Sequence, residues 1–180
     1  MRSNLIHLLL EHSVRWGEFT LKSGAKSNFY VDVRKTALHP GGSLAIAQAV
    51  LTSLNPEVEA IGGVELGAVP IIGSVITFAL MAPDPLPRPG FVVRKAAKGH
   101  GTQSKIENCP PAGTKVAIVE DVTTTGGSLE KAITAAQMAG LDVVQAITVV
   151  DRQEGAEEFL RAGGFTGTFT ALVTRTNLSI

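Results

Sequence analysis

One stretch, residues 116–128, limits most strongly what this chain can fold into. An apolar run, Val-Ala-Ile-Val, ends in the adjacent carboxylates Glu120 and Asp121, and a valine, three threonines, two glycines and Ser128 follow. The next residues, 129–136, have the pattern of a helix. A strand, a loop of small residues and a helix start in direct succession form an anion site, because the loop offers free backbone N–H groups and the helix N-terminus adds a favourable dipole. The stretch therefore predicts a phosphate cradle with an acidic pair beside it.

Two familiar phosphate motifs do not fit this stretch. No Gly-Lys-Ser/Thr follows the glycines, as a P-loop requires, and the Gly-x-Gly-x-x-Gly of a dinucleotide turn is missing. An ordinary strand-to-helix loop with polar residues capping the helix is the structural alternative. The position of the acidic pair favours a functional role, since open α/β sheets bind their ligands at the carboxyl ends of the strands.

Length and composition indicate a single domain, residues 1–180, with 44% hydrophobic residues to build its core. The 16 lysines and arginines balance 16 aspartates and glutamates, so no bulk charge favours nucleic acid or a membrane as a partner. The single cysteine, Cys109, excludes an internal disulfide and a cysteine-rich metal site and favours a reducing, cytoplasmic compartment. The longest uncharged run, residues 71–83, is shorter than the roughly 20 apolar residues that cross a bilayer.

Strand-like and helix-like segments alternate along most of the chain. The strand-like runs are residues 60–64, 91–93, 116–119, 143–150 and 165–173, and the helix-like runs are residues 3–16, 44–54, 71–81, 129–139 and 157–162. Alternation of this kind predicts the α/β class, with a mostly parallel sheet flanked by helices. Residues 39–42, His-Pro-Gly-Gly, predict a turn.

Residues 17–34 alternate between polar and apolar side chains on both sides of Ser23-Gly24, which predicts a hairpin. The hairpin would form a small N-terminal hood, mainly within residues 1–38, over the carboxyl edge of the sheet. Taken by itself, the pattern is equally typical of an edge hairpin with solvated lysines and with aromatic residues that cover the sheet.

The stretch at residues 116–128 resembles the phosphoribosyl-diphosphate signature of the type I phosphoribosyltransferases. The resemblance implies the fold of that family, with Glu120 and Asp121 beside the ribose hydroxyls of the donor. It also implies that the loop holds the donor through Val122, Thr123, Thr124, Thr125, Gly126, Gly127 and Ser128, with the 5-phosphate in the Thr/Gly part. Many members have Asp-Asp where this chain has Glu-Asp, and both charges are kept. The signature leaves the acceptor base open.

The sequence Phe-Thr-Leu-Lys-Ser-Gly-x-Lys-Ser-x-Phe-Tyr, residues 19–30, closely resembles the hood of the orotate phosphoribosyltransferases. This resemblance implies that Lys22 reaches the substrate site and that Phe29 and Tyr30 flank orotate. A planar base that carries a carboxylate suits an aromatic wall and a cation.

Asp-Arg-Gln-Glu, residues 151–154, follows the strand-like run 143–150. An Asp-Arg pair in this position is usually a structural ion pair or a cap. The same segment of the orotate enzymes implies that Arg152 binds the orotate carboxylate, for which a guanidinium offers two parallel hydrogen bonds. Thr124 is expected beside Arg152 at the base site.

Residues 94–105 carry five basic side chains in a chain of zero net charge. By itself this is typical of a solvated loop. The pattern Arg-Lys-x-x-Lys-x-His-Gly resembles the catalytic loop of the family, which implies that Arg94, Lys95, Lys98 and His100 bind the diphosphate. Lys98 and His100 would act in catalysis together with the acid pair, because cations that close over a leaving diphosphate exclude water and neutralise charge. In the family this loop reaches the neighbouring subunit, which implies a homodimer with shared active sites.

Residues 65–68, Glu-Leu-Gly-Ala, repeat the strand–loop–helix arrangement after the strand-like run 60–64. In the family the equivalent loop contacts the diphosphate, and some orotate enzymes have Tyr-Lys-Gly there. This chain has no lysine in the loop, so only its backbone amides are expected to make that contact.

Four motifs in family order imply transfer of ribose 5-phosphate from 5-phosphoribosyl 1-diphosphate to orotate, a step of de novo pyrimidine synthesis. Mg²⁺ is implied on the donor's own oxygens, with no direct protein ligand. A phosphoribosyltransferase for another base is an alternative, which the hood and Arg152 disfavour. A non-catalytic regulator that senses the donor is another, which Lys98 and His100 disfavour. A DNA-binding regulator would also carry a basic extension, and none is present.

Overall fold

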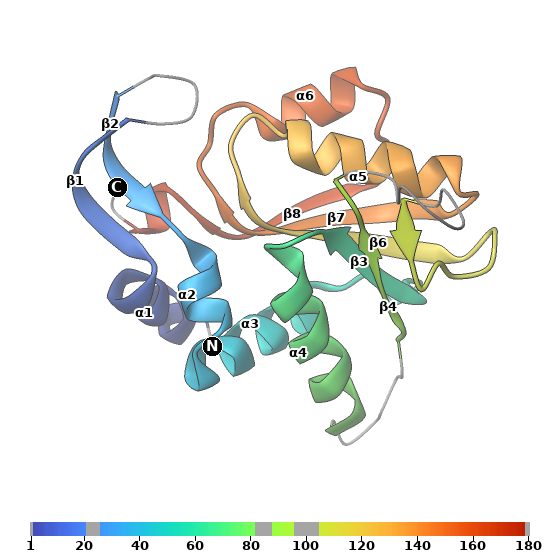
Figure 1. Ribbon diagram of the computed structural model, residues 1–180, viewed down its shortest axis with the longest axis horizontal. Coiled ribbons are helices and arrows are strands. Elements are labelled where there is room, and N and C mark those ends of the chain that lie inside the picture. The colour runs from blue at the N-terminus through green and yellow to red at the C-terminus, as the bar shows by residue number, and fades with distance from the viewer. Residues whose placement is uncertain (1, 21–25, 82–87, 96–104, 179–180) are drawn as a thin grey trace.

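The computed structural model describes residues 2–20, 26–81, 88–95 and 105–178 (Figure 1). Its main sheet has six strands in the order β5-β4-β3-β6-β7-β8. Neighbouring strands are parallel throughout, apart from the antiparallel pair β4 and β5. The strands are β3 (Ala60–Val64), β4 (Gly90–Val93), β5 (Ile106–Glu107), β6 (Lys115–Thr123), β7 (Asp142–Asp151) and β8 (Thr168–Thr174). The predicted α/β class with a mostly parallel sheet is confirmed.

Helices cover both faces of this sheet (Figure 1). One face carries α3 (Pro40–Ser53) and α4 (Ala68–Met81), and the other carries α5 (Gly127–Met138) and α6 (Ala156–Ala162). The side chains of β6 alternate between two cores: Ala117 and Val119 pack in the first, Val116 and Ile118 in the second. The strand is apolar without interruption because both of its faces are buried.

The N-terminal segment forms the predicted hairpin, in which β1 (Val14–Thr20) pairs antiparallel with β2 (Lys26–Val31). The tip, with the turn expected at Ser23-Gly24, lies outside the described residues. The hairpin stands beside the main sheet, next to α1 (Arg2–His12) and α2 (Val33–Ala37) (Figure 1). A short 3₁₀ helix, Thr176–Leu178, ends the described chain.

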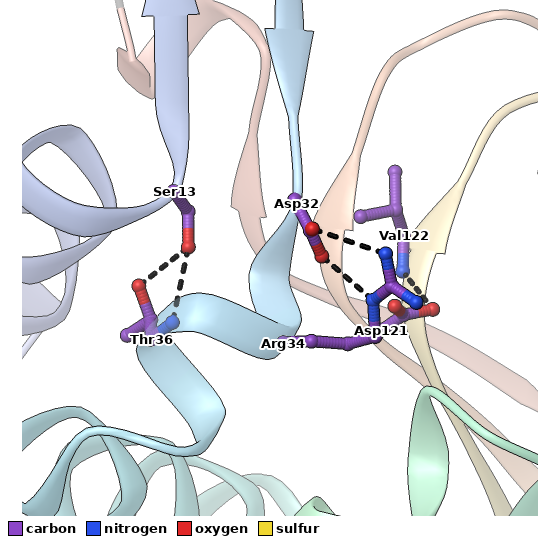
Figure 2. Close-up of polar contacts among 6 residues, drawn as sticks. All are labelled: Ser13, Asp32, Arg34, Thr36, Asp121 and Val122. Carbon is purple, nitrogen blue, oxygen red and sulfur yellow. Dashed lines mark hydrogen bonds and ion pairs between the residues drawn. The ribbon is translucent and has the colours of Figure 1, made fainter.

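The first helix ends earlier than its apolar pattern predicts, at His12 instead of near residue 16. Ser13 explains the break, because its buried Oγ lies 2.6 Å from the Thr36 Oγ1 and accepts a hydrogen bond from the Thr36 N–H at 3.3 Å (Figure 2). This contact with α2 stabilises the point where the chain leaves the helix and enters β1.

The turn predicted at residues 39–42 is wrong, since α3 begins at Pro40. Proline is well suited to a first helical position, where its missing N–H costs nothing. Gly42 lies directly against α2: a Cβ there would come within 2.2 Å of the Thr36 carbonyl oxygen. The glycine that resembles a turn signal is therefore a close helix–helix contact.

Candidate functional site

The candidate site lies where β3 and β6 end side by side. These parallel strands are paired through Gly63 and Val119, so the loops that follow them leave the sheet at the same edge. A cavity of about 210 Å³ opens there between the two loops and the hairpin. It is lined by Tyr30, Val31, Asp32, Arg34, Val64, Glu65, Leu66, Gly67, Lys95, Glu120, Asp121, Val122 and Ser128.

The acid pair stands at the inner wall of this cavity. Glu120 is 7% exposed, and its Oε2 is buried without a hydrogen-bond partner among the described residues. Burial, followed by the hydrogen bond to Asp121 and the charge of that residue, raises the pKa of Glu120 to about 8, while the charge of Lys95 opposes the shift. Asp121 Oδ1 accepts a hydrogen bond from the Val122 N–H at 2.9 Å (Figure 2). The two neighbouring carboxyl groups therefore have different surroundings.

The loop after β3 is shaped around Asp121. A Cβ on Gly67 would lie 2.5 to 2.6 Å from the carboxylate atoms of Asp121, so a residue without a side chain is needed at this contact. Glu65 Oε1 accepts a hydrogen bond from the Lys95 N–H at 2.8 Å, which ties the loop to the end of β4. The loop thus positions a carboxylate and the start of the basic segment.

The loop after β6 forms a small cradle at the start of α5. Gly126 has φ +88° and stands as the N-cap residue of the helix, with no side chain bonded to the cap. A hollow of about 30 Å³ lies over this turn, lined by Glu120, Val122, Thr123, Thr124, Gly126, Gly127, Ser128 and Leu129. Thr123 Oγ1 is buried and has no hydrogen-bond partner in the described part of the chain. This hydroxyl and the first N–H groups of α5 are donors for an anion.

Arg152 lies beside the cradle, because its backbone N–H donates to the Thr123 carbonyl at 2.9 Å. The residue is 8% exposed, and its Cζ lies 4.7 Å from the centre of the Phe29 ring. Its Nη2 pairs with Glu154 Oε1 at 2.9 Å, and its Nε is buried without a partner among the described residues. Arg175 also lies over the Phe29 ring, at 4.9 Å.

The two aromatic residues predicted for the acceptor differ in their surroundings. Phe29 is 2% exposed and belongs to the core, so its ring contacts Arg152 and does not line the cavity. Tyr30 is 40% exposed and lines the cavity. The alternation of β2 places the two side chains on opposite faces, which the sequence pattern already implies.

The basic segment is divided between two cavities. Lys95 lines the site cavity and also a second one of about 430 Å³ against α5. Arg94 lines only the second cavity, where its Nη1 lies 3.0 Å from Glu107 Oε1. Three residues predicted for the site, Lys22, Lys98 and His100, lie outside the described residues.

Asp32 and Arg34 line the site cavity and were not predicted from the sequence. Arg34 donates from Nε and Nη2 to the two carboxylate oxygens of Asp32, at 2.8 and 3.0 Å (Figure 2). The Arg34 guanidinium holds the pKa of Asp32 below its ordinary value. The Asp-x-Arg spacing, one residue after the aromatic pair, is a signal that could have been noticed. The alternating pattern instead extends the predicted hairpin through Arg34, whereas α2 begins at Val33.

The described ranges contain no group of three or more His, Cys, Asp or Glu side chains that could hold a metal ion. Within the same ranges, no helix is long and apolar enough to cross a membrane.

Comparison with protein families finds that the Phosphoribosyl transferase domain matches residues 41–161. The match begins in α3, includes the loops after β3 and β6, and ends in α6. It leaves out the hairpin, which the motifs relate to the acceptor.

Similar proteins extend the match to the hairpin. The orotate phosphoribosyltransferase of Synechocystis is 42% identical over 175 residues, which cover 97% of this chain and 86% of that protein. The crystal structure of the Mycobacterium tuberculosis orotate phosphoribosyltransferase has a TM-score of 0.83 and 36% identity, with 99% of both chains covered. A structure of the M. tuberculosis enzyme in complex with 5-phospho-α-D-ribosyl 1-diphosphate has a TM-score of 0.79, with 32% identity and 99% of both chains covered.

Proposed function

The chain belongs to the orotate phosphoribosyltransferases, and we propose that the cavity at the ends of β3 and β6 is its active site. The enzyme transfers ribose 5-phosphate from 5-phosphoribosyl 1-diphosphate to orotate and produces orotidine 5′-monophosphate and diphosphate, in pyrimidine synthesis.

Three buried atoms carry this placement. Glu120 Oε2, Thr123 Oγ1 and Arg152 Nε are buried and have no hydrogen-bond partner in the part of the chain that the structure describes. Buried polar atoms in folded proteins are nearly always hydrogen-bonded. Glu120 and Thr123 lie in the last part of β6, and Arg152 directly follows β7, so we assign the three atoms to contacts with the donor and the acceptor.

The donor lies along the edge of β6. Its 5-phosphate occupies the cradle, where Thr123 and the N–H groups at the start of α5 donate to it, together with Thr124, Thr125, Gly126, Gly127 and Ser128. The ribose hydroxyls face Glu120 and Asp121, and Val122 lines both the cavity and the hollow over the cradle. A related enzyme has been crystallised with this donor, which supports the assignment.

The acceptor lies between the donor and the hood. Arg152 binds the orotate carboxylate, and the Phe29 ring below its guanidinium holds the cation in place. Tyr30 and Thr124 flank the base, and Lys22 from the hairpin tip is the second cation for it. Glu154 is the counter-ion of Arg152 in the ligand-free protein.

Mg²⁺ fits the oxygen-rich side of the cavity. Two carboxyl groups, Glu120 and Asp121, face the place assigned to the ribose, and hard cations prefer such oxygen ligands. The ion would be held mainly by the donor, with these carboxylates nearby. When bound, it neutralises charge on the diphosphate.

The chemistry requires no side-chain nucleophile. The bond from the ribose C1 to the diphosphate oxygen breaks, and a bond forms from C1 to the N1 of an orotate that has already given its N1 proton to the solvent. The ribose becomes electron-poor as the diphosphate leaves, and the nearby Asp121 carboxylate favours that charge. Glu120, whose pKa is raised to about 8 in the ligand-free protein, offers its carboxyl group as a hydrogen-bond partner for a ribose hydroxyl. Positioning of both substrates, neutralisation of the diphosphate by Lys95, Lys98 and His100, and exclusion of water lower the barrier.

We propose a homodimer with shared active sites and one domain, residues 1–180, in each subunit. An apolar groove of about 570 Å³ between α3 and α4 supports the dimer, because Leu44 and Met81 on its rim are 46% and 76% exposed. One hydrophobic core that joins the hood to the sheet supports the single domain. The one exposed cysteine, Cys109, supports a reducing cytoplasm.

A base panel with Mg²⁺ and the donor tests the function directly. Loss of orotate absorbance is expected, with uracil and purines left unchanged. Turnover of another base without orotate would overturn the acceptor assignment, and donor binding without any turnover would favour a sensor.

Two variants test the shared site. Lys98→Ala should lose most activity, and unchanged activity would overturn the role given to the basic loop. A mixture of the inactive Lys98→Ala and Asp121→Asn proteins should recover part of the activity if each site takes residues from two subunits. Recovery would be absent in a monomer, which sedimentation would detect independently.

A further inference from the structure

The site cavity is rich in acidic side chains for a site that must hold a diphosphate. Its lining includes the acidic side chains of Asp32, Glu65, Glu120 and Asp121, and among the described lining residues Arg34 and Lys95 are the only cations. The loop at residues 65–67 contributes no positive charge. An anion with several negative charges needs cations at short range in such surroundings.

Arg34 is held in one orientation by Asp32. Its Nε and Nη2 each donate to one oxygen of that carboxylate, at 2.8 and 3.0 Å, and the Asp32 side chain is only 14% exposed. A two-point contact of this kind sets the plane of the guanidinium as well as its position. The flexible cation is therefore already ordered before any ligand binds.

One guanidinium nitrogen of Arg34, Nη1, takes no part in this contact with Asp32. Nη1 makes no hydrogen bond to any residue within the described ranges, although the Arg34 side chain is 47% exposed at the cavity. Figure 2 shows the guanidinium between Asp32 and the Asp121 carboxylate, which faces the ribose in the assignment above. The Nη1 side of the Arg34 guanidinium therefore lies next to the place assigned to the ribose C1 and its leaving group.

We propose that Arg34 binds the diphosphate of the donor and that Asp32 positions it for this purpose. The proposal rests on the proposed function, because it takes the ribose end of the donor to lie at Asp121. Arg34 and Lys95 then approach the diphosphate from two sides of the cavity, one from the base of the hood and the other from the end of β4. The hood therefore takes part in donor binding as well as in acceptor selection.

A simpler role for Arg34 is to balance the charges of Asp32 and Asp121. In that case its removal would change the pH dependence of the reaction and leave the affinity for diphosphate unchanged. A diphosphate contact instead predicts a loss of affinity that is present at every pH where the enzyme is folded.

The test is the binding of inorganic diphosphate with Mg²⁺ to the full-length protein, measured by calorimetry in Arg34→Gln, Arg34→Lys and Asp32→Asn. Arg34→Gln should weaken binding about tenfold or more, which is the scale of a lost charge-assisted hydrogen bond. Arg34→Lys should be intermediate, because an ammonium keeps the charge and loses the fork. Asp32→Asn should weaken binding less than Arg34→Gln.

The matched control is Lys115→Gln, which removes an ion pair of 2.6 Å to Glu57 at the opposite end of β6. It should leave diphosphate binding unchanged. In steady-state kinetics, Arg34→Gln should raise the KM for the donor and leave the KM for orotate within about twofold.

Diphosphate affinity within about twofold of wild type in a folded Arg34→Gln protein would overturn the proposal, as would an equal rise in both KM values. Thermal unfolding of each variant establishes that it is folded. Failure of the wild-type enzyme to use orotate would instead contradict the acceptor assignment. Diphosphate binding is measured without turnover, so the two failures are distinguishable.

Discussion

The two strand–loop–helix units at the site edge have the same architecture and different chemistry. β3 with α4 and β6 with α5 lie on paired parallel strands, and each loop meets the same cavity. The loop after β6 carries hydroxyls and free N–H groups for an anion, including Thr123 Oγ1, which has no hydrogen-bond partner among the residues that the structure describes. The loop after β3 instead shapes the cavity. Gly67 leaves room for the Asp121 carboxylate, and Glu65 Oε1 accepts a hydrogen bond from the Lys95 backbone N–H.

The two loops would therefore serve the same phosphorylated donor in different ways. In the proposed placement, the cradle contacts the 5-phosphate with atoms of its own backbone and side chains. The loop at residues 65–67 has no cation, so the charges on its side of the cavity come from Lys95 and, by our inference, from Arg34. Each loop needs a glycine for a different reason. Gly67 lets the Asp121 carboxylate approach the backbone closely, and Gly126 adopts a left-handed backbone conformation.

The largest effect is expected from Gly67→Ala. The new Cβ would collide with the Asp121 carboxylate, since it would lie only 2.5 to 2.6 Å from the atoms of that group. A displacement of about 1 Å at a reacting centre lowers kcat/KM about a hundredfold. Steady-state kinetics measures this loss. Gly163→Ala is the control, because its nearest contact is an ordinary 3.4 Å, and its activity should equal wild type. An active Gly67→Ala enzyme would show that the β3 loop does not shape the acid pair.

Glu120→Gln should change how stability depends on pH. The ordinary pKa of a glutamate carboxyl group is 4.5, and burial raises the pKa of Glu120 to about 8 in the folded protein. Between these values the unfolded chain has lost its proton while the folded protein keeps it, so wild-type stability falls as pH rises. Glutamine removes this dependence.

The stability advantage of Glu120→Gln over wild type should therefore grow by about 2 kcal/mol from pH 5 to pH 8, after allowance for partial relaxation of the site. Urea unfolding of the ligand-free proteins at each pH measures the difference, in which the other titrating groups cancel. Parallel pH curves for the two proteins would contradict burial of this carboxyl group.

Gly126→Ala should destabilise the cradle. Its φ of +88° is disfavoured for a residue with a side chain, and the Cβ would lie 3.1 Å from the Ala156 carbonyl oxygen. A loss of about 1–2 kcal/mol in the free energy of unfolding is expected. The neighbouring Gly127→Ala is the control, because nothing lies within 4 Å of its Cβ. Equal melting temperatures for the two ligand-free variants would contradict the strain at Gly126.

The smallest effect on stability is expected from Thr123→Val. The Thr123 hydroxyl has no partner among the described residues, whereas the equally buried Thr148 donates to the Val150 carbonyl at 3.1 Å. Thr148→Val should therefore cost about 1 kcal/mol, and Thr123→Val should cost nothing in the ligand-free protein.

Donor binding should show the reverse order for these two variants. Calorimetry with 5-phosphoribosyl 1-diphosphate should detect weaker binding in Thr123→Val and wild-type binding in Thr148→Val. If the Thr123→Val protein bound the donor with wild-type affinity, the Thr123 hydroxyl would not be part of the phosphate site.

Local patterns predicted much of the architecture. The β-branched run at residues 116–119, the apolar helix near residues 71–81 and the strand at 143–150 all appear, within a few residues of their expected ends. The errors occur where a contact with another segment overrides a local signal. Pro40 starts a helix whose Gly42 packs closely against Thr36, and the first helix stops at His12, next to Ser13, which bonds to that same Thr36.

The cradle and the acid pair could be predicted from the sequence, because strand, loop and helix start are contiguous and their chemistry is local. Which side chains share the cavity depends on the tertiary structure. It separated Lys95 from Arg94, buried Phe29 under Arg152, and brought Arg34 from the base of the hood to Asp121. These contacts join segments far apart in the chain, and their partners depend on how the hood packs on the sheet, which no local pattern of side chains specifies. The β3 loop, which has no cation of its own, depends on that packing most of all.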